Sequence, residues 1–90
     1  MKPTAAISEA MQHHQKGDLE KAEASYRELV SNKCTDKRVY VNLAAILRQK
    51  NNPKEAAFYA NEGLAKADKN SPILFNTLAN ALRDLSLIHI

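Results

Sequence analysis

The sequence contains no tryptophan, one cysteine and only two glycines among its 90 residues. The single cysteine, Cys34, cannot form an internal disulfide, which is consistent with a reducing compartment. The isolated glycines Gly17 and Gly63 do not form a glycine-rich loop of the kind that cradles phosphates. No segment approaches the roughly 20 apolar residues of a membrane span, and residues 1–17 lack the apolar stretch of a secretory signal. We therefore expect a cytoplasmic protein that does not associate with membranes.

The sequence also lacks a concentrated positive charge. It has 13 Lys and Arg against 10 Asp and Glu, a net charge of +3. The densest basic segment, Lys33–Arg38, is interrupted by Cys34, Thr35 and Asp36. Because nucleic-acid-binding domains gather Lys and Arg on one stripe, we expect no nucleic-acid partner. A nucleic-acid-binding helical domain is kept as an alternative, which a steep salt dependence of binding would identify.

No residues form a pattern typical of catalysis or metal binding. His13 and His14 are adjacent, and adjacent side chains on a helix point about 100° apart, so they cannot easily bind one metal ion. Nothing in the sequence pattern supplies a base that would activate Cys34 as a nucleophile. We therefore expect a non-enzymatic chain with no metal, no cofactor and no catalytic residue.

Helix-start signals recur along the whole chain. Asp18, Asn52 and Ser71 can each cap a helix, and a proline follows the last two at the first helical position. Together with Thr4 and Thr35–Asp36 they predict five helices, over residues 4–15, 19–31, 36–50, 53–67 and 72–85. Glu55 is placed to bond back to the N–H of the Asn52 cap. Because the joints between helices are short, neighbouring helices must run antiparallel.

A pattern in the second predicted helix returns in the fourth. Gly17–Ala22 is matched by Asn51–Ala56, 34 residues later (51 − 17), and each is preceded by an alanine, Ala10 or Ala44. The alanine at the positions of Ala10 and Ala44 occurs a third time at Ala79, 35 residues after Ala44 (79 − 44). Self-similarity at this period predicts stacked helix pairs, in which the small alanine lets the partner helix approach to about 8–9 Å.

These residues resemble tetratricopeptide repeats, whose units have 34 residues and two antiparallel helices. The matching residues are Ala10, Gly17, Asp18, Ala22 and Tyr26, then Tyr40, Asn42, Leu43, Ala44 and Ala56, then Phe75, Leu78, Ala79 and Leu82. The resemblance implies an all-α fold of antiparallel helix pairs, stacked as a short right-handed solenoid. One domain over residues 1–90 would hold repeats at 3–36 and 37–70 and a partial repeat at 71–85.

Three groups of residues lead to further predictions about the turns, the helix packing and the aromatic side chains. Asn51–Asn52 replaces the usual Gly-Asp turn, and asparagine tolerates the left-handed conformation needed there. Gly63 would weaken its helix unless the fifth helix packs closely against it. We expect the aromatic side chains to lie in the core or between repeats rather than to form a stacking platform: Tyr26, Tyr40, Phe58, Tyr59 and Phe75.

The last six residues depart from the repeat pattern. Residues 85–90 resemble a translated sequencing adapter, so we expect them to be a non-native tail on an N-terminal fragment of a longer protein. The alternative is a genuine apolar tail that covers the last helix.

The resemblance also implies a protein–protein interaction module, a scaffold or adaptor that binds a peptide or protein segment in a concave groove. The first helix of each pair would line that groove. Helical phase and the resemblance give the candidates Thr4, Ser8, Met11, Gln15, Arg38, Asn42, Ala45, Gln49, Ile73, Thr77, Asn80 and Asp84. Family members that bind extended peptides use an asparagine at the position of Asn42 to bond the peptide backbone, a task suited to an amide that donates and accepts.

The arginines near the groove, and the clamp residues that the sequence lacks, bear on which partner we expect. Arg38, with Arg48 and Arg83 near the rim, would make part of the surface basic, so the partner can carry acidic groups. Of the Lys, Asn and Arg set that clamps a terminal carboxylate in part of the family, only Asn42 is present, and we do not expect that clamp. In a second interpretation the chain is the N-terminal, substrate-positioning repeat region of a larger glycosyl-, sulfo- or methyltransferase.

Overall fold

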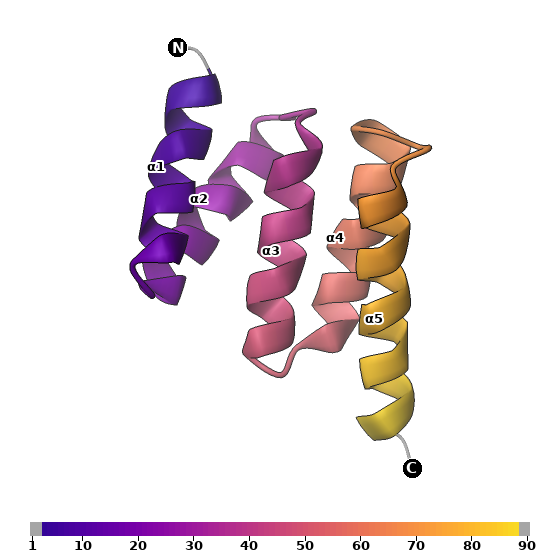
Figure 1. Cartoon of the computed structure of the whole chain (residues 1–90). Helices are drawn as coiled ribbons and strands as arrows, with labels where there is room; N and C mark the ends of the chain where they lie inside the picture. Colours follow the sequence, from indigo (N-terminus) through magenta and orange to yellow (C-terminus); the bar gives the residue numbers. More distant parts are fainter. Residues whose placement is uncertain (1–2, 89–90) are drawn as a thin grey trace.

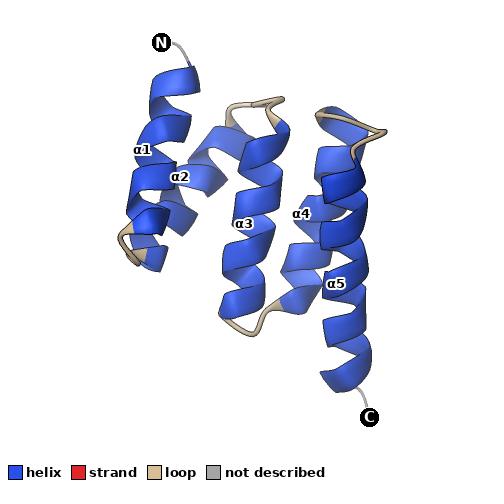
Figure 2. Cartoon of the chain, viewed as in Figure 1, coloured by secondary structure: helices blue, strands red, loops and turns tan. Residues whose placement is uncertain are grey.

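Five helices make up the computed structural model, which describes residues 3–88 and the side chains of residues 5–86. They are α1 (Pro3–Gln15), α2 (Leu19–Ser31), α3 (Lys37–Gln49), α4 (Pro53–Lys66) and α5 (Pro72–Ile88) (Figure 2). The described residues contain no strand, so the predicted all-α class is confirmed. Five boundaries differ from expectation: α1 begins at Pro3, so Thr4 lies inside the helix, α3 is one residue shorter at each end, α4 ends at Lys66, and α5 continues to Ile88. Residues 89 and 90 lie outside the described part.

Short polar side chains start the helices as the sequence indicated. Asp18 Oδ1 accepts a hydrogen bond from Lys21 N at 3.3 Å, and Ser71 Oγ accepts one from Leu74 N at 3.3 Å. Asn52 Oδ1 accepts from Glu55 N at 3.4 Å, while Asn52 Nδ2 donates to Glu55 Oε1 at 2.8 Å. Glu55 therefore reaches back to the side-chain amide of the cap and not to its backbone N–H, because asparagine carries its own donor.

Left-handed residues make the turns within and between the helix pairs. Gly17 has φ +81° between α1 and α2, and Asn51 has φ 62° between α3 and α4, as expected for these positions. Lys33, which follows α2, also has a positive φ of 61°, and nothing in its chemistry indicated this. The hydrogen bonds that close the end of α2, from Lys33 N to Val30 O at 3.0 Å and from Cys34 N to Leu29 O at 3.1 Å, hold Lys33 in this conformation.

The helices form two layers. In Figure 1, α1, α3 and α5 stand side by side in front, and α2 and α4 lie behind them. Consecutive helices are in contact along the chain, and α3 also contacts α5 directly. The result is a stack of antiparallel helix pairs with extents of 44 × 29 × 19 Å, the predicted solenoid.

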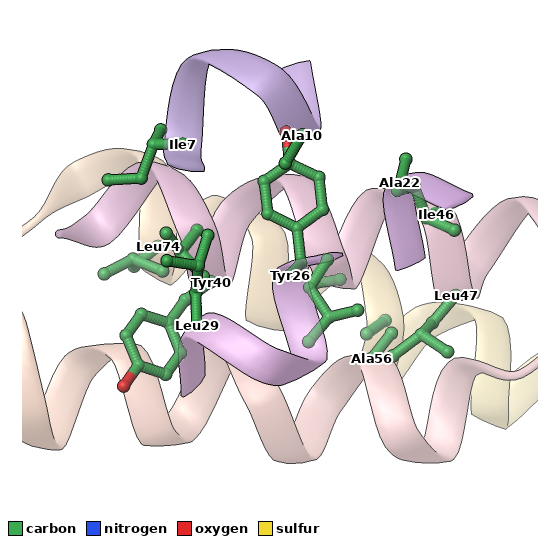
Figure 3. Close-up of a cluster of buried hydrophobic side chains, with 14 of the residues drawn as sticks. Ile7, Ala10, Ala22, Tyr26, Leu29, Tyr40, Ile46, Leu47, Ala56 and Leu74 are labelled. Atoms are coloured by element: carbon green, nitrogen blue, oxygen red, sulfur yellow. The ribbon is translucent and has the colours of Figure 1, made fainter. Parts of the chain in front are cut away.

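One hydrophobic cluster runs through all five helices. Figure 3 shows side chains converging from each of them, among them Ala10, Tyr26, Tyr40, Ala56 and Leu74. Ala10, Ala44 and Ala56 are fully buried, which lets paired helices approach closely. The small alanines that recur in the sequence are therefore buried where helices pack closely, as the sequence predicted.

Close packing around Gly63 is also confirmed, with one addition. A Cβ built on Gly63 would lie 2.9 Å from Leu74 Cδ2 of α5, as expected, and 2.7 Å from Tyr40 Cβ of α3. The expectation for the aromatics is right for Tyr26 and Tyr40, which are buried, and wrong for Phe58 and Phe75, which are 56% and 53% exposed. The Phe58 ring packs edge to face on Tyr59, with 5.1 Å between the ring centroids, and more than half of each phenylalanine remains exposed.

An ion-pair network joins the two repeats behind the front layer. Arg27 of α2 bonds Glu23 at 2.7 Å and reaches Glu55 of α4 at 3.0 Å. Lys50, which caps α3, contacts Glu23 at 2.6 Å and Glu20 at 2.7 Å. The hydrogen bond from Lys50, and then Arg27, lower the pKa of Glu23, whereas its burial acts in the opposite direction. The network therefore favours the ionised carboxylates and helps to hold the repeats in register.

Candidate functional site

An open hollow of about 360 Å³ lies on the front layer between α1 and α3. Met11, His14 and Gln15 of α1 and Asn42 of α3 line it. The helix positions explain this set, since Met11, His14 and Gln15 lie three and four residues apart and share one face of α1. Sequence reasoning selected three of these residues and missed His14, although its spacing of three from Met11 is a signal that could have found it.

A buried tyrosine holds the Asn42 side chain. Asn42 Nδ2 donates a hydrogen bond to Tyr26 Oη at 3.1 Å. Tyr26 is fully buried, and burial raises the pKa of its hydroxyl, which therefore stays protonated at neutral pH. In the described part of the chain no hydrogen bond reaches Asn42 Oδ1. The amide is thus fixed by a neighbour and retains an acceptor oxygen and a second N–H for a ligand.

Arg38 precedes Asn42 by one helical turn and is paired with a carboxylate of its own chain. Its guanidinium bonds Asp36 at 2.7 Å, and this bond holds the pKa of Asp36 below its ordinary value. Arg48 likewise bonds Asp84 of α5 at 2.7 Å and lowers the pKa of that carboxyl group. Two of the three arginines expected near the rim are therefore ion-paired, and an acidic ligand would have to compete with Asp36 and Asp84 for them.

The other predicted groove residues do not line the hollow. Thr77 Oγ1 donates to Ile73 O at 2.7 Å, and Asn80 Oδ1 accepts from Arg83 at 3.4 Å, so both polar groups of α5 have local partners. The side chain of Thr4 lies outside the described residues. Exposed positions are Ser8, Gln49 and Ile73, whereas Ala45, Thr77 and Asn80 are half-buried.

Metal sites and membrane-spanning helices are absent from the part of the chain that the structure describes. No group of three or more His, Cys, Asp and Glu residues that could hold a metal ion occurs between residues 3 and 88. None of the helices described there has the length and apolar character needed to cross a membrane. The chemistry of the hollow and its rim is that of amides, an imidazole, a thioether and paired ions.

Comparison with known proteins gives the family. A family model described as "Tetratricopeptide repeat" matches residues 8–33 and 37–65, more than half of the chain. The chain belongs to the tetratricopeptide repeat family. No curated protein and no solved structure matches it. The two matched segments lie within the helix pairs α1–α2 and α3–α4, and tetratricopeptide repeats are in general protein–protein interaction modules.

Proposed function

We propose that this tetratricopeptide repeat protein is a scaffold or adaptor that binds an extended peptide segment across the face formed by α1, α3 and α5. The observation that carries the proposal is the Asn42 amide, which Tyr26 holds at the hollow while its oxygen and one N–H stay available. An extended peptide presents alternating backbone N–H and C=O groups, and a fixed amide can pair with one of each. Fixing the amide in advance also reduces the entropy lost on binding.

The neighbouring residues support a peptide ligand rather than a small charged molecule. Met11 offers a flexible apolar contact that adapts to different side chains. Gln15 offers a second amide on the opposite wall of the hollow. This combination gives affinity through the peptide backbone and a mild preference for apolar side chains.

Arg38 supports a partner with an acidic group near this part of the groove. Its side chain is 52% exposed although it is paired with Asp36, so a ligand carboxylate can reach it. Competition with Asp36 means that such a contact contributes little affinity and acts mainly on orientation. We expect binding in the cytoplasm, with a protein partner and without nucleic acid.

The test removes the amide and controls for its structural role. Peptides are selected against the wild-type chain from a random decapeptide library, and their affinity is measured by fluorescence anisotropy. Asn42→Ala should weaken binding about tenfold, because two backbone hydrogen bonds of about 0.5–1.5 kcal/mol are lost. Tyr26→Phe breaks the same Tyr26–Asn42 bond but keeps the amide, so it should weaken binding much less.

Asn42→Ala should lose about 1–3 kcal/mol of stability, because it leaves the buried Tyr26 hydroxyl without a hydrogen-bond partner, whereas Tyr26→Phe removes that hydroxyl and should lose about 1 kcal/mol or less. Melting curves of the two proteins measure these losses, and the affinities are compared at a temperature where both variants are folded. Selected peptides that bind Asn42→Ala as tightly as wild type would contradict the proposed groove. Lys54→Ala, an exposed change on α4, serves as the neutral reference.

A further inference from the structure

The hollow between α1 and α3 has a single ionisable side chain among the described residues that line it, His14. The other lining residues are uncharged: the amides of Gln15 and Asn42 and the thioether of Met11. Histidine is the side chain that ordinarily changes charge between about pH 5 and 8. The charge of the hollow therefore depends on His14, whereas the peptide contacts proposed for the other three residues leave its imidazole unused.

The two adjacent histidines have different surroundings. His13 Nε2 lies 3.9 Å from Glu9 Oε1, one turn back on α1, and His13 does not line the hollow. His14 is half-buried, and its ring makes no ion pair and no hydrogen bond with any of the described residues. Lys16, which follows α1, is exposed and does not line the hollow either. The ring nitrogens of His14 are therefore available to a ligand.

Ionisable groups next to the hollow come from α2 and α3, and none of them offers His14 an unengaged carboxylate. On α3, Arg38 holds Asp36 at 2.7 Å. At the start of α2, Asp18 accepts a hydrogen bond from Lys21 N at 3.3 Å and lies 3.9 Å from Lys21 Nζ. The hydroxyl of Tyr26, which holds the amide of the groove from behind, stays protonated at neutral pH. A carboxylate that pairs with His14 must therefore come from the ligand.

We propose that His14 selects peptides that place a carboxylate side chain over the hollow, where the protonated imidazole binds it as an ion pair. The inference rests on the proposed function, since the peptide backbone must first lie on Asn42. An aspartate or glutamate there meets the imidazolium from α1, has Arg38 one turn beyond Asn42 on α3, and finds no carboxylate among the lining residues to repel it. The sequence alone suggested an acidic partner for the arginines, whereas the structure adds His14 as the residue that selects it.

The sign of the pH dependence follows from this pair. The ion pair needs a protonated imidazole and an ionised carboxylate, and both are present at about pH 6 because free glutamate ionises near pH 4.3. Since the hollow is open to water, a glutamate peptide should bind about three- to fivefold tighter at about pH 6 than at about pH 8. The same peptide with glutamine in place of glutamate should bind equally at both. Raising NaCl to about 0.5 M should remove most of the difference.

The experiment uses decapeptides selected from a random library on the full wild-type chain at about pH 6. Only peptides that Asn42→Ala binds about tenfold more weakly are kept, which restricts the set to ligands of the groove. Each acidic residue of a kept peptide is changed to its amide, and affinities are measured by fluorescence anisotropy at both pH values. One such change should abolish the pH dependence of binding.

Three variants of the chain identify the imidazole that is responsible. His14→Gln keeps a hydrogen-bonding side chain without the charge, so its affinity for the glutamate peptide should no longer rise as pH falls. His14→Arg carries a permanent charge and should bind that peptide tightly at both pH values. His13→Gln, the matched control, removes the neighbouring imidazole outside the hollow and should keep the wild-type pH dependence. All three should melt within about 4 °C of wild type, as expected for substitutions away from the core.

Several results would overturn the inference while leaving the peptide groove in place. Peptides that depend on Asn42 but carry no acidic residue, or bind equally at both pH values, would show that His14 does not select a carboxylate. Loss of the pH dependence in His13→Gln, with the dependence retained in His14→Gln, would assign it to the wrong imidazole. A wild-type chain that selects no peptide dependent on Asn42 would contradict the proposed function, and this inference with it.

Discussion

Replacing Gly63 by alanine tests the packing of the second repeat through a change of one methyl group. The added Cβ would lie 2.7 Å from Tyr40 Cβ and 2.9 Å from Leu74 Cδ2. The leucine methyl can rotate away, but Tyr40 Cβ is one bond from the backbone of α3 and cannot. The two paired helices must therefore move apart.

The sign of the effect follows from two opposing terms. Alanine is favoured over glycine inside a helix by about 1 kcal/mol, which would stabilise the variant. Overpacking a tight contact costs about 1–3 kcal/mol, and an obstacle anchored to the backbone places the cost in the upper part of that range. We expect Gly63→Ala to be less stable by about 1–2 kcal/mol. In a domain of this size each kcal/mol lowers Tm by about 4–8 °C.

Urea unfolding followed by circular dichroism measures the difference. Ala65→Gly, at an exposed position of the same helix, calibrates the propensity term and should lose about 1 kcal/mol. A gain of stability in Gly63→Ala, equal in size to the loss in Ala65→Gly, would refute the argument. It would mean that α3 and α5 do not approach this glycine closely.

Two further predictions follow from burial and from the ion-pair network. Ala44→Leu should destabilise the chain by about 1–3 kcal/mol through overpacking. Ala79→Leu, at the corresponding but exposed position, should change stability by less than about 0.5 kcal/mol. Equal melting temperatures for the two variants would contradict the helix-pair geometry. The pKa of Glu23 is lowered in the folded state, so its contribution to stability should be present above the pKa of the unfolded chain and lost as pH falls through the folded value. Urea titrations from neutral to acidic pH measure this loss, and Lys50→Met should make the dependence shallower.

Much of the fold is visible in the sequence because it depends on local interactions. Capping by Asp18, Asn52 and Ser71 uses bonds within four residues, and the left-handed turns at Gly17 and Asn51 depend on the conformational range of the residues themselves. The repeat of small alanines adds long-range information, since one period recurs wherever paired helices meet. Helix number, helix pairing and family could therefore be predicted.

The site is harder to predict from the sequence, because each of its features depends on a contact between two segments of the chain. Helical phase and the family resemblance together selected Met11, Gln15 and Asn42 but could not show that α1 and α3 leave a hollow there. Nor could it show that Asn42 donates to Tyr26, 16 residues earlier in the chain. For the same reason helical phase could not show that Arg48 is ion-paired, since its partner Asp84 lies in another helix.

The sequence by itself determined which residues start the helices, which residues make the turns and which positions recur from repeat to repeat. These properties arise within one turn of a helix or one period of the array. Tertiary structure alone decided which faces are covered. Tyr40 and Phe75 hold corresponding places in the repeat, yet Tyr40 is 1% exposed and Phe75 is 53% exposed. The physical reason is that the burial of a side chain depends on two helices. The same apolar positions become core where a second helix packs against them and remain exposed where none of the described helices does.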